Sequence, residues 1–380
     1  MDIERQNHGT GRFIGKIGFI IEQDVEEWKG KGKYFSANVK PFVDLSLGLR
    51  LIGEESVLLV NKSEKHLDEK IRSVTKELVP IFYFDSLDFE KVLRESSVKY
   101  LVVDDRIKIM KNILRYKDKG FETVVFVQYL YGLGTNVRAK RSRSLELAMG
   151  SNIPWKFIIK TYRDLLLRFD HVISNSQTTR WVLRQIYDLS SDGTVYPPVG
   201  IDMRPIIERM KWPTKKLGIL VFAGDLERDY FSRNIITELK YLRKELDEPI
   251  KLFVSNHEAT ELLNFNDVEV YSRLPVEELV RLYVESKATY IPTAVELFGH
   301  TSAESVLCGT PSILDEYHPV LETFPMETNA ITIASHRLKI SEVFLEIMNQ
   351  RIDIETARKY ISEKYSAEES ARALVKSIGI

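Results

Sequence analysis

Short apolar runs alternate with longer amphipathic stretches along the whole chain. Nine runs rich in β-branched residues predict strands, at residues 16–22, 56–60, 99–104, 123–129, 171–176, 218–224, 250–255, 268–272 and 288–292. The segments between them, such as 88–97 and 277–286, carry apolar residues at i, i+3, i+4 and i+7, a spacing typical of helices. Strands that are apolar throughout and separated by helices favour parallel sheets with both faces covered.

The periodicity breaks at residues 196–216, where YPPVGIDMRPIIERMKWPTKK contains four prolines and one glycine. The alternation of strands and helices restarts directly afterwards. We therefore predict an α/β protein of two Rossmann-like, doubly wound domains, at residues 1–200 and 201–355, joined by a hinge. Ligands of such folds bind beyond the carboxyl ends of the strands, so the cleft between the domains is the expected active site.

The amino-acid composition limits which kinds of molecule the protein is expected to bind and where it is expected to work. The 380 residues are enough for two domains with proper cores. The 54 Lys and Arg residues balance 55 Asp and Glu residues, so the net charge of -1 gives no general attraction to nucleic acid. Cys308 is the only cysteine, which excludes an intramolecular disulfide and fits a reducing compartment. No apolar run reaches the ~18 residues of a membrane span, so we expect a soluble, cytoplasmic protein.

The most informative stretch is PTAVELFGHTSAESVLCGTPSIL, residues 292–314, which reads as strand end, loop, helix and strand. Two interpretations of Glu304 are open. TSAE could be a capping box, with Thr301 as N-cap and Glu304 reaching back to its amide. Alternatively, Glu304 and Glu296 could accept hydrogen bonds from neighbouring hydroxyl groups of a sugar or ribose. Gly299 would then let the ligand approach the backbone, beside the free N–H groups of the helix start.

This stretch resembles the donor-site signature of family 4 glycosyltransferases, which have the GT-B fold of two Rossmann-like domains facing a cleft. Segments 169–202, 221–234 and 274–292 are similar to the same family in order and spacing. The resemblance implies that Glu296 is catalytic and holds the sugar of a nucleotide-sugar, and that Glu304 holds the ribose. It implies a return of residues 356–380 to the first domain. The remaining donor-binding residues that it implies, mainly through loop amides, are Phe298, Gly299, His300 and Thr301.

The expected diphosphate site departs from the family pattern. The arginine that usually follows the glycine of VFAG is Asp225 here, an acid that would repel phosphate. Arg233 matches the family's catalytic-site lysine after a short insertion, and Arg228 could replace the missing charge. Both arginines could instead be solvated charges at a helix start. His300 stands at a common leucine position and could bind phosphate or sugar, or cap the loop.

Two segments of the first half carry candidate contacts. In WKGKGKYF, Gly30, Gly32 and Lys33 form a candidate acceptor or phosphate loop, at a place where the family has a glycine-rich loop. The second segment is a basic run that could contact an anionic acceptor or make a peripheral membrane contact, or could be a solvated face. It consists of Arg138, Lys140, Arg141 and Arg143.

The combined prediction is a retaining glycosyltransferase. It would move a sugar from a UDP- or GDP-type nucleotide-sugar to a hydroxyl of a glycan, lipid or small-molecule acceptor, with no cofactor beyond that co-substrate. No strict Asp-x-Asp motif occurs, which argues against a metal-dependent enzyme of the other major glycosyltransferase fold. Gln128, at a predicted strand end, is a candidate cleft residue. One alternative is a nucleotide-sugar-binding protein of the same fold without transfer activity, which Asp225 keeps open. Another is a GT-B epimerase or phosphorylase.

Overall fold

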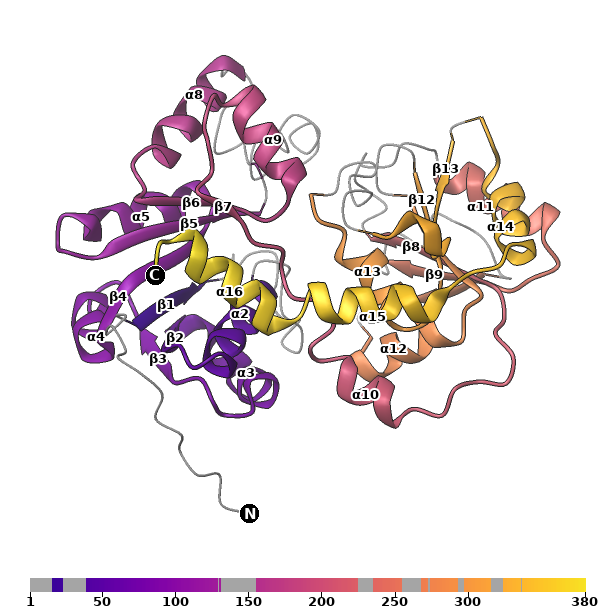
Figure 1. Cartoon of the computed structure of the whole chain (residues 1–380), viewed down its shortest axis with the longest axis horizontal. Coiled ribbons are helices and arrows are strands. Elements are labelled where there is room, and N and C mark those ends of the chain that lie inside the picture. Colours follow the sequence, from indigo (N-terminus) through magenta and orange to yellow (C-terminus); the bar gives the residue numbers. More distant parts are fainter. Residues whose placement is uncertain are drawn as a thin grey trace.

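The computed structural model describes residues 16–22, 39–128, 130, 155–224, 235–254, 268–272, 274–292, 297–315, 324–335 and 337–380. These residues form two lobes, each built around one parallel sheet (Figure 1). The architecture confirms the predicted α/β class with two Rossmann-like domains.

The first sheet has seven strands within the described ranges, in the order β3-β2-β1-β4-β5-β6-β7, and all pairs are parallel. The strand order reverses between β1 and β4, which is the point where open α/β sheets bind ligands. The strands are β1 (Lys16–Ile21), β2 (Ser56–Asn61), β3 (Ile81–Phe84), β4 (Val98–Asp104), β5 (Glu122–Val127), β6 (His171–Ser174) and β7 (Gly193–Thr194).

The second sheet has six described strands in the order β10-β9-β8-β11-β12-β13, again all parallel. Here the order reverses between β8 and β11. The strands are β8 (Ile219–Gly224), β9 (Ile250–Val254), β10 (Val268–Tyr271), β11 (Ala288–Ile291), β12 (Ser312–Asp315) and β13 (Ile331–Ala334).

Helices cover both faces of the first sheet because successive side chains of each buried strand point to opposite faces. In β2, Leu59 packs into the core cluster of one face, and Leu58 and Val60 pack into that of the other. The first face is covered by α4 (Phe89–Ser96), α5 (Ile107–Lys117), α8 (Trp155–Leu166) and α9 (Gln177–Ile186). The other face is covered by α2 (Lys40–Leu51), α3 (Asp68–Thr75) after the 3-10 turn η1 (Lys62–Leu67), and α16 (Ala367–Ser377).

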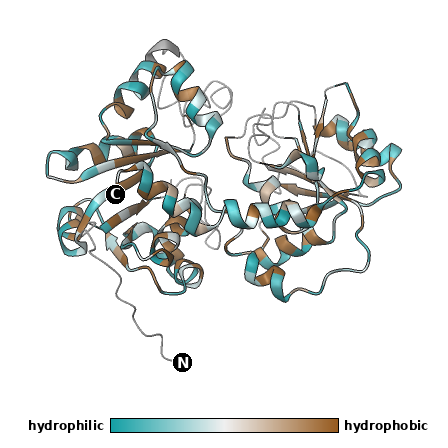
Figure 2. Cartoon of the chain, in the orientation of Figure 1, coloured by the Kyte–Doolittle hydropathy of each residue, from teal (hydrophilic) through white to brown (hydrophobic). Residues whose placement is uncertain are grey.

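The second sheet repeats this arrangement. Leu220 of β8 packs toward one set of helices, and Ile219 and Val221 pack toward the other. Figure 2 shows the resulting pattern, with hydrophobic strands inside and hydrophilic outer helix faces. One face carries α10 (Arg204–Arg209), α12 (Val276–Val284), α13 (His300–Leu307) and α15 (Ile354–Lys364), and the other carries α11 (Ile235–Glu245) and α14 (Ile340–Asn349). The 3-10 turn η4 (Met326–Thr328) precedes β13.

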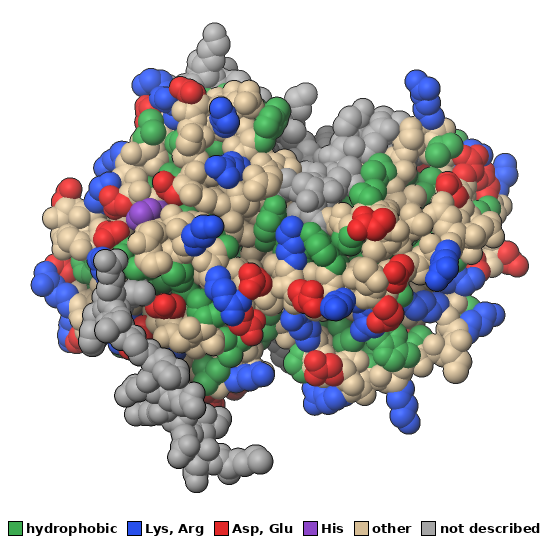
Figure 3. All heavy atoms as spheres, in the orientation of Figure 1, with side chains coloured by type: hydrophobic (Ala, Val, Ile, Leu, Met, Phe, Trp, Pro, Cys, Tyr) green, Lys and Arg blue, Asp and Glu red, His purple; other side chains and the backbone are tan. Residues whose placement is uncertain are grey.

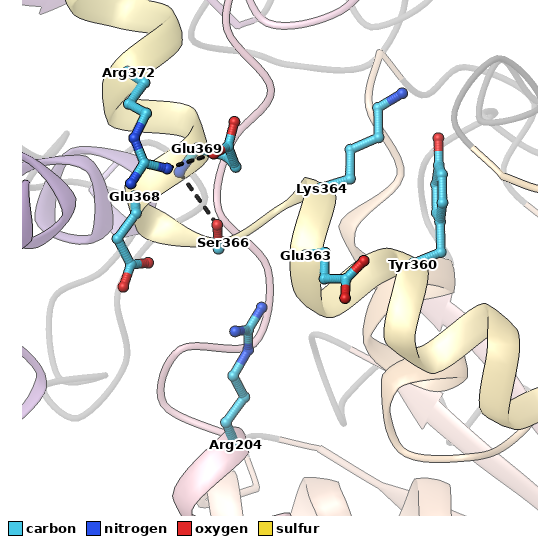
Figure 4. Close-up of a pocket in the computed structure, with 8 residues that line it drawn as sticks. All are labelled: Arg204, Tyr360, Glu363, Lys364, Ser366, Glu368, Glu369 and Arg372. Carbon is cyan, nitrogen blue, oxygen red and sulfur yellow. Dashed lines mark hydrogen bonds and ion pairs between the residues drawn. The ribbon is translucent and has the colours of Figure 1, made fainter.

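The last two helices connect the lobes. Helix α15 packs against α13 of the second lobe, whereas α16 packs against α2 and β7 of the first. At their junction the carbonyl of Tyr365 accepts from the Val199 amide at 3.0 Å, and Arg204 Nη2 donates to the Ser362 carbonyl at 3.1 Å. An open depression of about 660 Å³ lies here, lined by Arg204 and side chains of α15 and α16 (Figure 4). Its cations and carboxylates are interspersed, and Arg372 pairs with Glu369.

All nine predicted strands are present, with small shifts at their ends. Three strands, β3, β7 and β13, were not predicted, and each lies at an edge of its sheet. Edge strands are short and partly solvated, and β3, β7 and β13 have four, two and four residues, several of them only partly buried. Among the described helices, none combines the length and the apolar character that crossing a bilayer requires.

Candidate functional site

The predicted donor loop begins where the second sheet reverses its strand order. Strand β11 ends at Ile291 beside β8, which ends at Gly224, and both strands run in the same direction. The segments that follow them therefore start from the same edge of the sheet. Arg228 and Arg233 belong to the segment after β8, and Glu296 to the segment after β11. These three residues and Asp225 lie outside the described residues.

The helix that follows the loop begins without a side-chain cap. Gly299 is the N-cap residue of α13, with a left-handed φ of 82°. Because this turn brings the chain into the helix at His300, Thr301 is already its second residue and cannot take the extended conformation of an N-cap. Of the two interpretations of Glu304, the Thr301–Glu304 capping box is therefore wrong. Glu304 is the fifth residue of the helix, and capping does not use its carboxylate.

The left-handed glycine gives a test of how the loop supports the site. Replacing Gly299 by alanine should cost about 1–2 kcal/mol of stability in urea unfolding, because a Cβ is strained at positive φ. Gly53 is a matched control, since its φ is 89° and an added Cβ there meets no atom within 4 Å. Both variants should lose similar stability, but only Gly299→Ala should weaken binding of a nucleoside diphosphate. Equal nucleotide affinity in the two variants would contradict the placement of the ligand at this turn.

The side chain of Glu304 is half-buried, and its carboxylate is free to accept hydrogen bonds from a ligand. It makes no hydrogen bond or ion pair within the part of the chain that the structure describes. Burial raises the pKa of Glu304 to about 7, with Lys40 opposing the shift and Asp202 and Asp44 adding to it. Near neutral pH, this side chain can therefore be present as a carboxylate or as a neutral acid.

Lys40, Asp44 and Asp202 form an ion group between the two lobes, and their charges act on the pKa of Glu304. Lys40 begins α2 in the first lobe, and its ammonium lies 3.2 Å from Asp44 and 2.8 Å from Asp202 of the linker. Burial by itself lowers the pKa of Lys40, but the carboxylates of Asp44 and Asp202 outweigh it and the net shift is upward. Burial raises the pKa of Asp44 to about 6, and this side chain is fully buried. An aspartate inside the apolar helix KPFVDLSLGL was the one sequence signal for this group.

Aromatic rings hold the loop against the linker and the end of α15. Phe298 is buried, with its ring centroid 6.0 Å from that of Tyr196 and 5.4 Å from that of Tyr365. His300 meets the Phe298 ring edge-on at 4.8 Å. Leu297 packs against the core of the first lobe, so the loop touches both lobes.

His300 is a neutral imidazole at physiological pH. Burial, assisted by the Lys40 charge, lowers its pKa to about 3. Its Nδ1 atom is buried and has no hydrogen-bond partner among the described residues. The N-cap of α13 is Gly299, which has no side chain to cap the helix, and the role of His300, as a ligand-binding or a loop-capping residue, stays a prediction.

Several polar side chains at the carboxyl ends of the first sheet's strands are held by hydrogen bonds and ion pairs. Asp105, directly after β4, accepts from the Gln128 amide at 2.9 Å and from the Tyr162 hydroxyl at 2.7 Å. Gln128 follows β5, and its Nε2 atom is buried without a hydrogen-bond partner in the described ranges. Buried Arg106 pairs with Asp104 at 2.7 Å. Of these residues, only Gln128 was a sequence candidate.

The other candidates cannot be placed. Gly30, Gly32 and Lys33 of the glycine-rich segment fall outside the described residues. The same holds for the basic run of Arg138, Lys140, Arg141 and Arg143. On the face shown in Figure 3, acidic and basic side chains are intermixed over both lobes.

Solved structures define the class of fold. The chain resembles sucrose-phosphate synthase from Thermosynechococcus elongatus (TM-score 0.64, 12% identity, 96% of each chain covered). It also resembles a glycosyltransferase from Rickettsia africae ESF-5 (TM-score 0.64, 14% identity, 96% of this chain and 97% of the other). A mutant of TarM from S. aureus, in complex with fondaparinux, alpha-GlcNAc-glycerol and UDP, gives a TM-score of 0.64 at 10% identity, over 97% of this chain and 100% of that one. The fold is GT-B. No curated protein sequence matches this chain.

A family model identifies the second lobe. Residues 206–367 match the family described as Glycosyl transferases group 1. This segment contains α13, Glu304 and the loop before them. Residues 206–367 therefore carry a Glycosyl transferases group 1 domain, within a chain of GT-B fold.

Proposed function

We propose that this protein is a retaining, metal-independent glycosyltransferase that moves a sugar from a UDP- or GDP-sugar to an acceptor hydroxyl. Residues 201–355 would bind the donor and residues 1–200 the acceptor, with 356–380 returning to the first domain. The observation that carries the proposal is the environment of the Glu304 carboxylate. Its half-buried carboxylate lacks a partner in the described structure and lies in the helix that follows β11, within the segment that matches the family.

The proposed roles follow from the chemistry of the donor. Glu304 accepts hydrogen bonds from the two ribose hydroxyls, which one carboxylate can bind together. The first N–H groups of α13 and neutral His300 face the sugar or the diphosphate, because helix N-termini favour anions. Glu296 holds the sugar hydroxyls, and Arg233 with Arg228 neutralises the diphosphate.

Transfer requires no protein base in this proposal. The bond between the anomeric carbon and the diphosphate oxygen breaks, and the acceptor oxygen forms its new bond on the same face of the sugar. The acceptor proton passes to the departing diphosphate. Stabilising the charge that develops on this leaving group is the main electrostatic task of the site.

The reaction itself tests the proposal. Incubation with UDP- and GDP-sugars and a panel of hydroxyl acceptors should release nucleoside diphosphate and give a product with the donor's anomeric configuration, read by NMR. UDP is the first nucleotide to try, because a structurally similar TarM complex holds it. Binding without turnover on any acceptor would favour the second candidate, a nucleotide-sugar-binding protein, for which Asp225 in place of the family's arginine is the supporting observation.

Turnover is expected to survive removal of divalent metal. Arginine side chains and helix amides neutralise the diphosphate in the proposed site, and no Asp-x-Asp motif is present to bind a metal bridge. The initial rate in excess EDTA should stay within about twofold of the untreated rate, because no barrier contribution is lost. A rate that collapses in EDTA and returns with Mg²⁺ or Mn²⁺ would contradict this part of the proposal.

A further inference from the structure

The described chain passes from one lobe to the other at two places, in the linker that follows β7 and at the junction of α15 and α16 (Figure 1). Each place carries an aromatic ring that contacts Phe298 of the donor loop. The ring centroid of Tyr196 in the linker lies 6.0 Å from that of Phe298, and the centroid of Tyr365 at the junction lies 5.4 Å from it. The two tyrosine rings meet each other edge-on at 5.5 Å. We call these three side chains the junction ring cluster.

The rings of this cluster are packed against one another. Tyr365 is fully buried, Phe298 is 5% exposed and Tyr196 is half-buried. The Phe298 and Tyr365 rings cross at 75°, an arrangement that aromatic pairs favour because the positive edge of one ring faces the negative face of the other. The Lys364 ammonium lies 5.6 Å from the centroid of the Tyr196 ring, within the range at which a cation is attracted to an aromatic face.

Hydrogen bonds fix the two crossings to each other beside the rings. The Val199 amide donates to the Tyr365 carbonyl at 3.0 Å, and Arg204 Nη2 donates to the Ser362 carbonyl at 3.1 Å. The linker and the end of α15 are thus tied into one unit that carries both tyrosine rings. Phe298 rests on this unit through both of its ring contacts.

Phe298 stands between a contact with the first lobe and the start of α13. Leu297, directly before it, packs against the core of the first lobe. Gly299, directly after it, is the N-cap of α13, and the His300 ring meets the Phe298 ring edge-on at 4.8 Å. Because Phe298 immediately precedes the helix start, its position determines where the free amides of the first turn point. The ring contacts therefore act on the groups that face the donor in the proposed site.

We propose that Tyr196 and Tyr365 are positioning residues for donor binding: their rings hold Phe298, and with it the start of α13, in an orientation set by the two chain crossings. This inference rests on the proposed donor-binding role of the loop. The tyrosines act on the nucleotide through Phe298 and not by touching it. Nucleotide affinity is then set in part at the junction of the lobes, outside the donor site itself.

The test is the affinity of the full chain for UDP and GDP, measured by isothermal titration. Tyr365→Leu removes one ring from the cluster and should weaken nucleotide binding by about three- to tenfold, the range that contacts between aromatic rings contribute. Tyr365→Phe keeps the ring and should keep the wild-type affinity. Tyr196→Leu should weaken binding in the same way. Because Tyr196 is only half-buried, this variant decides the question if Tyr365→Leu fails to fold.

A double variant tests whether Tyr365 acts through Phe298. Phe298→Leu alone should also weaken nucleotide binding. Adding Tyr365→Leu to Phe298→Leu should lower the affinity no further, because the contact that Tyr365 supplies is already lost and the effects of residues in contact do not add. If the two losses multiply in the double variant, Tyr365 does not act through Phe298, and the inference is wrong.

Phe89→Leu is the matched control. Phe89 is buried in the first lobe, with its ring centroid 4.4 Å from that of Phe84 and 5.0 Å from that of Tyr116. This variant also removes one ring from a group of three, so it should lower the melting temperature while leaving nucleotide affinity unchanged. An equal loss of affinity in Phe89→Leu would mean that general destabilisation, and not the junction ring cluster, weakens binding.

The outcomes separate this inference from the proposed function. If Tyr365→Leu and Tyr196→Leu keep the wild-type affinity while Glu304→Gln loses it, the junction ring cluster is purely structural and the donor site stands. If Glu304→Gln and Gly299→Ala also keep the wild-type affinity, the donor does not bind at this loop, and the inference fails with the proposed function.

Discussion

Replacing Glu296 by alanine is expected to lower kcat by roughly 100-fold, because hydrogen bonds to sugar hydroxyls that tighten as the ring flattens toward an oxocarbenium ion supply several kcal/mol. The affinity for free nucleoside diphosphate should remain almost unchanged, since that ligand has no sugar for Glu296 to contact. Contacts that strengthen in the transition state appear in kcat more than in KM. The measurement pairs transfer kinetics on the matching donor with isothermal titration of the diphosphate.

The comparison with Glu304→Gln gives this prediction its control. The two glutamates flank the same glycine turn, so general damage to the loop would affect both variants alike. If Glu296→Ala loses nucleotide affinity as severely as Glu304→Gln, the sugar is not beside Glu296. The donor would then lie in another orientation, or the pair would serve a different ligand.

Replacing Glu304 by glutamine should weaken binding of both the free nucleoside diphosphate and the intact donor by about tenfold or more at pH 8. A hydrogen bond to a charged group contributes about 1.5–3 kcal/mol, and ~1.4 kcal/mol corresponds to a factor of ten. The loss should shrink below pH 6. There the wild-type side chain is itself mostly neutral, because burial raises its pKa to about 7.

Thermal unfolding without ligand separates binding from stability in this experiment. Glu278→Gln is the control, since Glu278 is exposed in the first turn of α12 in the same lobe and should leave affinity unchanged. Unchanged nucleotide affinity in Glu304→Gln, with only a lower melting temperature, would make Glu304 a structural residue of α13.

Local sequence patterns predicted the central strands and their parallel pairing, because both follow from the order of apolar runs and helices along the chain. Runs such as 57–60 and 100–103 are apolar at every position, and only a strand covered on both faces buries all of them. The edge strands β3, β7 and β13 escaped this reasoning, because a strand with one neighbour needs fewer buried residues. The capping box failed for a different reason. Thr301 and Glu304 have the right spacing. However, the N-cap is the left-handed Gly299, so the helix begins earlier in the chain than a capping box at Thr301 requires.

The sequence by itself determined the α/β class, the two-domain division of the strand pattern and the candidate loop around Glu304, since these follow from periodicity and from a motif of adjacent residues. Only the tertiary structure brought Lys40 and Asp44 to Asp202, in a group whose charges act on the pKa of Glu304. Lys40 and Asp202 are far apart in the chain, yet their charged atoms lie 2.8 Å apart. No local pattern encodes such a contact, because it depends on how α2, the linker and α13 pack together. The protonation of Glu304 depends in turn on the burial and the field that this packing creates.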